Sequence, residues 1–171
     1  MKSTLITAIL MCIFALSYPV AAQDTSLDGI YRQSVTISKD GMMLERGDKA
    51  LSEVVIFGHG TDLETAAMNI MSRVGVICSL EDGRISEVSE DEFYISSKGM
   101  FFGDPECQVN FKKSGDNLKI TGTQNCDEFC GYGAKFKGAK LKKICPADEG
   151  AIAHLTDLFY VNADNQYVCG E

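Results

Sequence analysis

The 171-residue sequence contains no tryptophan, only three prolines and two histidines. No run of 18 apolar residues occurs, so the sequence predicts no membrane-spanning helix. Familiar catalytic signatures are also missing: there is no nucleophile elbow, H-E-x-x-H motif, glycine-rich phosphate loop or EF-hand loop. The glycines of Gly58-His59-Gly60 indicate a tight turn rather than a catalytic loop. We therefore expect a protein that is not an enzyme, with no catalytic residue, no metal site and no cofactor.

The charge is biased toward acid, with 24 Asp and Glu against 16 Lys and Arg and a net charge of −8. Proteins that bind nucleic acid carry a basic footprint, so nucleic acid is not expected as a partner. An acidic surface favours solubility and attracts cationic partners. Five lysines do gather between residues 135 and 143. That cluster is interpreted as a solvated face or as protection of an edge strand.

The first 22 residues have the pattern of a signal peptide. Lys2 supplies the positive charge, residues 5–16 form an apolar run interrupted by Thr7, and residues 20–22 are small. The run is too short to span a bilayer. We expect cleavage after Ala22, a periplasmic or secreted protein, and no membrane insertion after cleavage.

Six cysteines follow the predicted signal peptide, and an even count in an exported chain indicates disulfides. The alternative is a zinc site, because Cys126-x3-Cys130 has a possible half-site spacing. No histidine completes that pattern, so disulfides are favoured. Six cysteines allow 15 pairings, and the spacing does not choose among them. The candidate disulfide residues are Cys78, Cys107, Cys126, Cys130, Cys145 and Cys169.

Alternating and β-branched segments predict a chain that is mainly β. An Asp-Gly pair at Asp82-Gly83, between two such segments, predicts a hairpin turn. Residues 63–71 fit either a helix, begun by a capping box of Thr61 and Glu64, or a half-buried strand. The other expected strands cover residues 29–37, 51–57, 74–80, 84–88, 92–96, 107–111, 118–122 and 134–144, the last with a bulge at Gly138.

The last segment differs from the rest of the chain. Pro146, followed by Ile152, Leu155 and Phe159 at helical spacing, predicts a short amphipathic helix, and residues 166–169 could form a final strand. Cys145 and Cys169 bracket this unit, and pairing them would close a loop worth roughly 3 kcal/mol. We therefore divide the mature chain into a β domain at 23–144 and an appendage at 145–171.

Three cysteine-containing segments stand in an order that resembles a group of exported bacterial proteins rich in cysteine and β structure. The segments are Cys78-Ser79-Leu80, Cys107-Gln108-Val109-Asn110-Phe111 and Cys126-Asp127-Glu128-Phe129-Cys130-Gly131, followed by Ala134-Lys135-Phe136-Lys137-Gly138. The C-x3-C-G element is the most specific part. Some members of the group are described as lysozyme-inhibitor-like. The resemblance covers residues 50–143.

The resemblance implies an antiparallel sheet or small open barrel stapled by disulfides, with the helical appendage added at the C-terminus. It also favours a strand over residues 63–71, because the group is β-rich before its first cysteine. Two departures stand out: Ile77 replaces the small residue or histidine that often precedes that cysteine, and residues 145–171 have no counterpart in the group.

Acidic residues between 81 and 92 are the candidate binding surface for a partner. Lysozymes are commonly basic, so complementary potentials would speed encounter with an acidic inhibitor, whose loop would occlude the cleft of the target. We therefore expect a non-catalytic, exported protein-binding domain that inhibits lysozyme or another cell-wall hydrolase. The alternatives are a structural or adhesive envelope protein and a barrel that binds a small ligand inside. The candidate partner-binding residues are Glu81, Asp82, Glu90, Asp91 and Glu92.

Overall fold

The computed structural model describes residues 26–170 except 41–43, 100–102, 132–133, 137, 158–160 and 163. The predicted signal peptide and Phe159 therefore lie outside the described residues. The elements, in chain order, are β1 (Gly29–Thr36), β2 (Lys49–Phe57), β3 (Thr65–Met71), β4 (Ile77–Glu87), β5 (Glu92–Ser97), β6 (Cys107–Ser114), β7 (Asn117–Gln124), the 3-10 turn η1 (Asp127–Phe129), β8 (Lys140–Cys145) and α1 (Glu149–Thr156).

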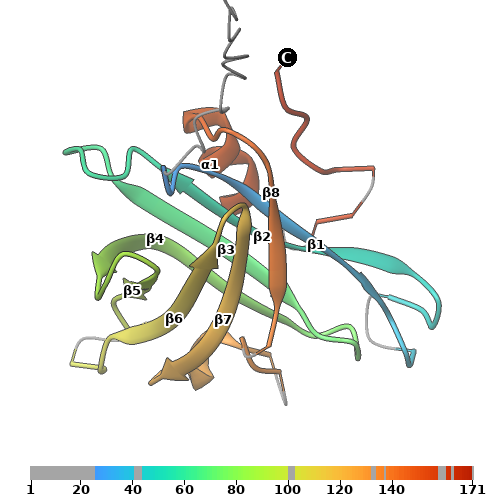
Figure 1. Ribbon diagram of the computed structural model, residues 1–171. Coiled ribbons are helices and arrows are strands. Elements are labelled where there is room, and N and C mark those ends of the chain that lie inside the picture. The colour runs from blue at the N-terminus through green and yellow to red at the C-terminus, as the bar shows by residue number, and fades with distance from the viewer. Residues whose placement is uncertain are drawn as a thin grey trace, which may run out of the picture.

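The strands form a closed antiparallel barrel in which each strand pairs with the next along the chain (Figure 1). Pairing of β8 with β1 closes it, with Arg32 opposite Lys142 and Ile30 opposite Cys145. The expected mainly β fold is thus confirmed, and the barrel is closed. Residues 65–71 form a strand, so the helical alternative for this segment is wrong. Its strand alternation packs Ala66, Met68 and Ile70 into the core.

Alternate residues of the strands fill the inside of the barrel. Tyr31, Phe111 and Phe136 are among its largest fully buried side chains. The Tyr31 hydroxyl donates a hydrogen bond of 2.8 Å to the carbonyl oxygen of Leu27, which satisfies the one polar atom of this ring. Phe93 and Phe111, opposite each other on β5 and β6, stack with ring centroids 5.1 Å apart. Large side chains therefore occupy the interior that a barrel of eight strands encloses.

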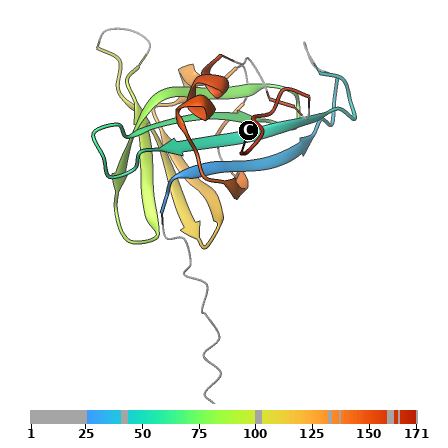
Figure 2. The same cartoon turned by 90° about the horizontal axis from the view of Figure 1, so that it is seen from above.

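The C-terminal appendage packs on the outside of the barrel, across β2 and β3 (Figure 2). Ala151 and Leu155 of α1 are buried against Leu51, Val55 and Ala67, which point outward from the barrel. The helix begins at Asp148, whose side chain accepts a hydrogen bond of 2.9 Å from the amide of Ala151. Because both of its faces are covered, β2 is buried along almost its whole length, including the polar Ser52 and Glu53.

An ion pair between Arg32 and Glu53 lies under the end of the appendage. The two residues are register partners on β1 and β2, and their side chains are only 14% and 1% exposed. Arg32 also donates hydrogen bonds to the Gln166 side chain at 2.5 Å and to the Tyr167 carbonyl at 3.0 Å. Burial raises the pKa of Glu53 above its ordinary value, while the charge and hydrogen bonds of Arg32 oppose that rise. Arg32 thus links the barrel to the appendage.

Three disulfides join the six cysteines. Cys78 pairs with Cys130, Cys107 with Cys126, and Cys145 with Cys169, the last being the pairing expected from their positions around the appendage. Three disulfides fit an oxidising compartment outside the cytosol. Within the described residues, no helix is both long and apolar enough to cross a membrane.

Three expected elements differ from the structure. Residues 81–83 do not form a hairpin turn, because β4 runs through them without a break. Residues 166–169 form no strand; instead Val161 makes an isolated bridge to Leu51. The last barrel strand begins at Lys140 rather than residue 134, because Gly138, at φ 91°, interrupts the extended backbone before it.

Replacing Arg32 should leave Glu53 as a buried carboxylate without its partner. We expect Arg32→Met to lower the free energy of unfolding by about 3–5 kcal/mol at neutral pH. It also removes the charge and hydrogen bonds of Arg32, which lower the pKa of Glu53, so that pKa should rise further. A carboxyl whose pKa is higher in the folded than in the unfolded chain contributes to the stability of the fold in acid. That contribution is lost as the pH rises through the folded pKa. The variant should therefore recover stability in mild acid.

Urea unfolding at a series of pH values would measure this effect. The double variant Arg32→Met/Glu53→Gln is the control, because it has no buried carboxyl to titrate. We expect its difference from the single variant to shrink as the pH falls. A single variant whose deficit is the same at every pH would contradict the assignment of the effect to Glu53.

Candidate functional site

A β-bulge in the middle of β4 lies beside a surface pocket. Between Ala66 and Met68 the register of β3 shifts, so that Ala66 lies opposite Gly83 and Met68 opposite Leu80. The segment of β4 between these partners is thus one residue longer than the matching segment of β3, which is the definition of a bulge. Asp82 takes a left-handed backbone conformation, with φ 49°, which asparagine and aspartate adopt more readily than most residues. The Asp-Gly pair therefore marks a bulge rather than a turn.

The bulge lies where β4 changes its pairing partner. Residues 77–83 pair with β3, whereas Arg84 to Glu87 pair with β5. Gly83 fits here because a side chain would collide with its neighbours: a Cβ atom would lie 2.5 Å from Ile95 Cγ2 and 3.0 Å from the carbonyl oxygen of Ala66. β5 continues to Ser97 without pairing with the first half of β4. The two strands therefore diverge beyond Arg84.

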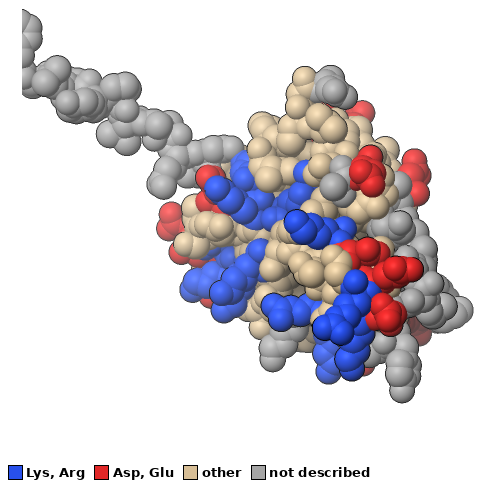
Figure 3. Space-filling model, turned by 90° about the vertical axis from the view of Figure 1, so that its right-hand side faces the viewer, with Lys and Arg blue, Asp and Glu red and all other residues tan. Residues whose placement is uncertain are grey.

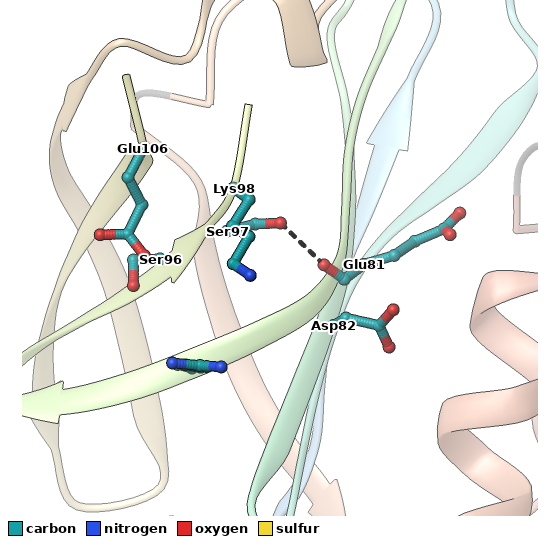
Figure 4. Close-up of a pocket in the computed structure, with 7 residues that line it drawn as sticks. Glu81, Asp82, Ser96, Ser97, Lys98 and Glu106 are labelled. Atoms are coloured by element: carbon teal, nitrogen blue, oxygen red, sulfur yellow. Dashed lines mark hydrogen bonds between the residues drawn. The ribbon is translucent and has the colours of Figure 1, made fainter. Parts of the chain in front are cut away.

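A surface pocket of about 330 Å³ lies where β4 and β5 diverge. Figure 4 shows Glu81 and Asp82 on β4, with their carboxylates directed away from Ser97 and Lys98, which lie on the other side of the pocket. The Ser97 hydroxyl donates a hydrogen bond of 3.0 Å to the Glu81 carbonyl, which ties the walls together at one point. Three acids and two bases line the pocket together with two serines: Glu81, Asp82, Glu106, Arg84, Lys98, Ser96 and Ser97.

Two disulfides hold the walls of this pocket in place. Cys78, three residues before Glu81, is bonded to Cys130, and the amide of Gly131 donates a hydrogen bond of 2.9 Å to the Ile77 carbonyl. Cys107, directly after Glu106, is bonded to Cys126. The segment around η1 therefore anchors both the strand that carries the bulge and the start of β6. The C-x3-C spacing places the two partner cysteines at either end of this short segment.

The structure places the five candidate partner-binding residues in two groups. Glu81 and Asp82 are exposed at the bulge and line the pocket. Glu90 and Asp91 lie in the β4–β5 turn, and Glu92 begins β5. Glu92 forms an ion pair of 3.4 Å with Lys112, so part of its charge is neutralised. The second half of β4 separates the groups, which therefore do not form one acidic patch.

Five pocket residues were not among the sequence candidates: Arg84, Ser96, Ser97, Lys98 and Glu106. They come from β4, β5 and the segment before β6 and meet only through strand pairing. In the sequence, only Glu106 has a local feature that sets it apart: it directly precedes Cys107, one of the candidate disulfide residues. Among the described residues, no group of three or more His, Cys, Asp or Glu side chains is placed to hold a metal ion.

The fold is that of a disulfide-bonded, closed antiparallel barrel of eight strands with an external C-terminal helix. Comparisons with models of protein families, with curated proteins and with solved structures give no match for this chain.

A side chain at residue 83 should disrupt the bulge. We expect Gly83→Ala to lower the free energy of unfolding by about 1–3 kcal/mol, because Ile95 and Leu80 are buried and have little room to yield. The matched control is Gly122→Ala in β7, where the added Cβ would have its nearest contact, Asn110 Nδ2, at an ordinary 3.6 Å. Urea unfolding of both variants measures the difference, and equal stabilities would contradict the packing described for Gly83.

Proposed function

We propose that this protein is a non-catalytic, exported protein-binding domain that inhibits a basic cell-wall hydrolase such as a lysozyme. Its target would contact the rim of the pocket through Glu81 and Asp82. The observation that carries the proposal is the position of these two exposed acids, on a bulge whose strand is held by a disulfide.

Acids on a backbone held by strand pairing and a disulfide suit such a role for two physical reasons. A binding surface that is already ordered loses little conformational entropy on association, so more of the contact energy appears as affinity. Acidic side chains on a molecule with a net charge of −8 also steer a basic target toward the complex. The hollow between β4 and β5 could receive one side chain or sugar-sized group of the target.

The acids of the β4–β5 turn are proposed as a second contact for the same target. Glu90 and Asp91 are exposed, and the Asp91 carbonyl accepts a hydrogen bond of 2.7 Å from the Lys113 amide, which fixes the turn against β6. Glu92 is engaged with Lys112 and would contribute less. We therefore rank the bulge above the turn as the primary contact.

Localisation in the periplasm or outside the cell is part of the proposal. It is supported by the three disulfides and by the signal-peptide pattern of residues 1–22. A structural or adhesive role in the envelope is the alternative for the same compartment. Binding of a small ligand inside the barrel is less favoured, because large side chains such as Phe111 and Phe136 fill the described interior.

Inhibition of wall hydrolases tests the proposal. Oxidised protein from Gln23 onward would be titrated into a panel of basic lysozymes and peptidoglycan amidases, and the clearing of cell-wall suspensions would be followed. We expect inhibition at about one inhibitor per enzyme, with an affinity that falls as salt is raised, because exposed charges are screened. Failure to inhibit any enzyme at micromolar concentration would overturn the proposal and favour the structural alternative.

Two variants of equal charge would locate the surface. Glu81→Gln/Asp82→Asn should raise the inhibition constant roughly tenfold or more, since charges at a binding surface are each worth on the order of 1 kcal/mol. Glu90→Gln/Asp91→Asn removes the same two charges from the turn and should have the smaller effect. If the turn variant weakened inhibition more, the primary contact would be the turn and not the pocket.

A further inference from the structure

Three lysines lie side by side across the outside of the barrel. Lys112 on β6 is directly opposite Lys119 on β7, and Lys119 is directly opposite Lys140 on β8. All three are exposed, while the neighbouring Phe111, Ile120 and Leu141 are buried in the core. We call Lys112, Lys119 and Lys140 the lysine row. Lys142, also exposed and two residues along β8, adds a fourth cation on the same face.

The lysine row is unfavourable for the isolated barrel. Directly opposite residues in antiparallel strands have Cα atoms about 4.5–5.5 Å apart, and like charges at that spacing repel. Lysines on an outer strand often protect a free edge from pairing with another chain. Here that explanation fails, because β8 is paired with both β7 and β1. The row therefore costs stability without protecting an edge.

Few acids compensate the row. Lys112 is paired with Glu92 at its β5 end, with a nitrogen–oxygen distance of 3.4 Å. Among the described residues, no acidic side chain lies within ion-pair distance of Lys119, Lys140 or Lys142. Figure 3 shows lysine and arginine side chains spread across one face of the molecule, with acidic side chains mainly at the left and right flanks of that face. A protein of net charge −8 thus presents a local cationic strip.

We propose that the lysine row binds a linear anionic glycan that runs across strands β6, β7 and β8. The row is one residue wide and presents its cations at regular intervals, which suits a single narrow chain with a negative charge on successive units. A nucleic acid duplex is too broad to follow the row without meeting the acids around it, and the net charge opposes it. Lysine recognises such anions as a point charge without the fixed geometry that arginine requires. This inference is independent of the pocket and of hydrolase inhibition.

Binding to polygalacturonate, a linear polymer of uronic acids, tests the proposal. Oxidised full-length mature protein would be titrated with labelled polymer by fluorescence anisotropy at several salt concentrations. The logarithm of the binding constant should fall linearly with the logarithm of salt, with a slope of roughly −2 if three lysines each displace a counterion. Neutral dextran of the same length should not bind. No binding of polygalacturonate at low salt, or equal binding of dextran, would overturn the proposal.

Charge-matched variants separate the row from general attraction. Lys112→Gln/Lys119→Gln/Lys140→Gln should weaken binding roughly tenfold or more and flatten the salt slope. The control, Lys39→Gln/Arg46→Gln/Arg73→Gln, removes three cations from the β1–β2 and β3–β4 turns, which are joined by a hydrogen bond of 2.7 Å from Ser38 to the Arg73 carbonyl. The control should bind nearly as the parent does. An equal loss in both variants would overturn the lysine row as the site.

Two further measurements make the result specific. Removing the repulsion should raise the Tm of the lysine-row variant, so a loss of binding could not be attributed to unfolding. A variant that binds less and melts lower would count against the proposal.

A single-stranded oligonucleotide provides the competing class of polymer. If it binds through the row and polygalacturonate does not, the glycan assignment is wrong.

Discussion

Hydrogen bonding between the first and last strands of the barrel is the constraint on which the rest of the structure depends. Once β8 pairs with β1, the eight strands have no exposed sheet edge, and alternate side chains must point either into a closed interior or outward. The inward side chains form the main core, and the outward ones are free to carry charge or to receive the appendage. The pocket and the lysine row are both consequences of this sorting.

Much of the barrel could be predicted from alternation within single segments. The strands around Val109 and Ile120 follow it closely, and their pairing with the next segment along the chain adds little ambiguity. The Asp82-Gly83 pair shows where such reasoning fails. A type I′ hairpin turn uses such a pair because it needs positive φ at both residues. In the bulge only Asp82 has positive φ, and Gly83 is required because Ile95 leaves no room for a side chain. Only the register between β3 and β4 selects the bulge, and register is a property of two segments together.

The candidate surfaces show the same limit. A cluster such as Glu90 to Glu92 is evident from the sequence, but the structure places it apart from Glu81 and Asp82. The lysine row is not evident from the sequence, because its members are 7 and 21 residues apart along the chain and meet only across paired strands. Its neighbours in sequence, including Lys135 and Lys142, suggested a local cluster instead. Charge patterns on a sheet run perpendicular to the chain, so they become visible only when pairing is known.

The appendage covers apolar side chains that point away from the barrel, among them Leu51, Val55 and Ala67. All strands of the barrel precede it in the chain, so the barrel can close while this outer surface is still exposed to water. Such an intermediate would be prone to self-association until α1 docks and Cys145 bonds to Cys169. The rate at which this one disulfide forms would therefore determine how long the newly made protein remains prone to self-association. It would affect the yield of folded protein independently of the stability of the barrel itself.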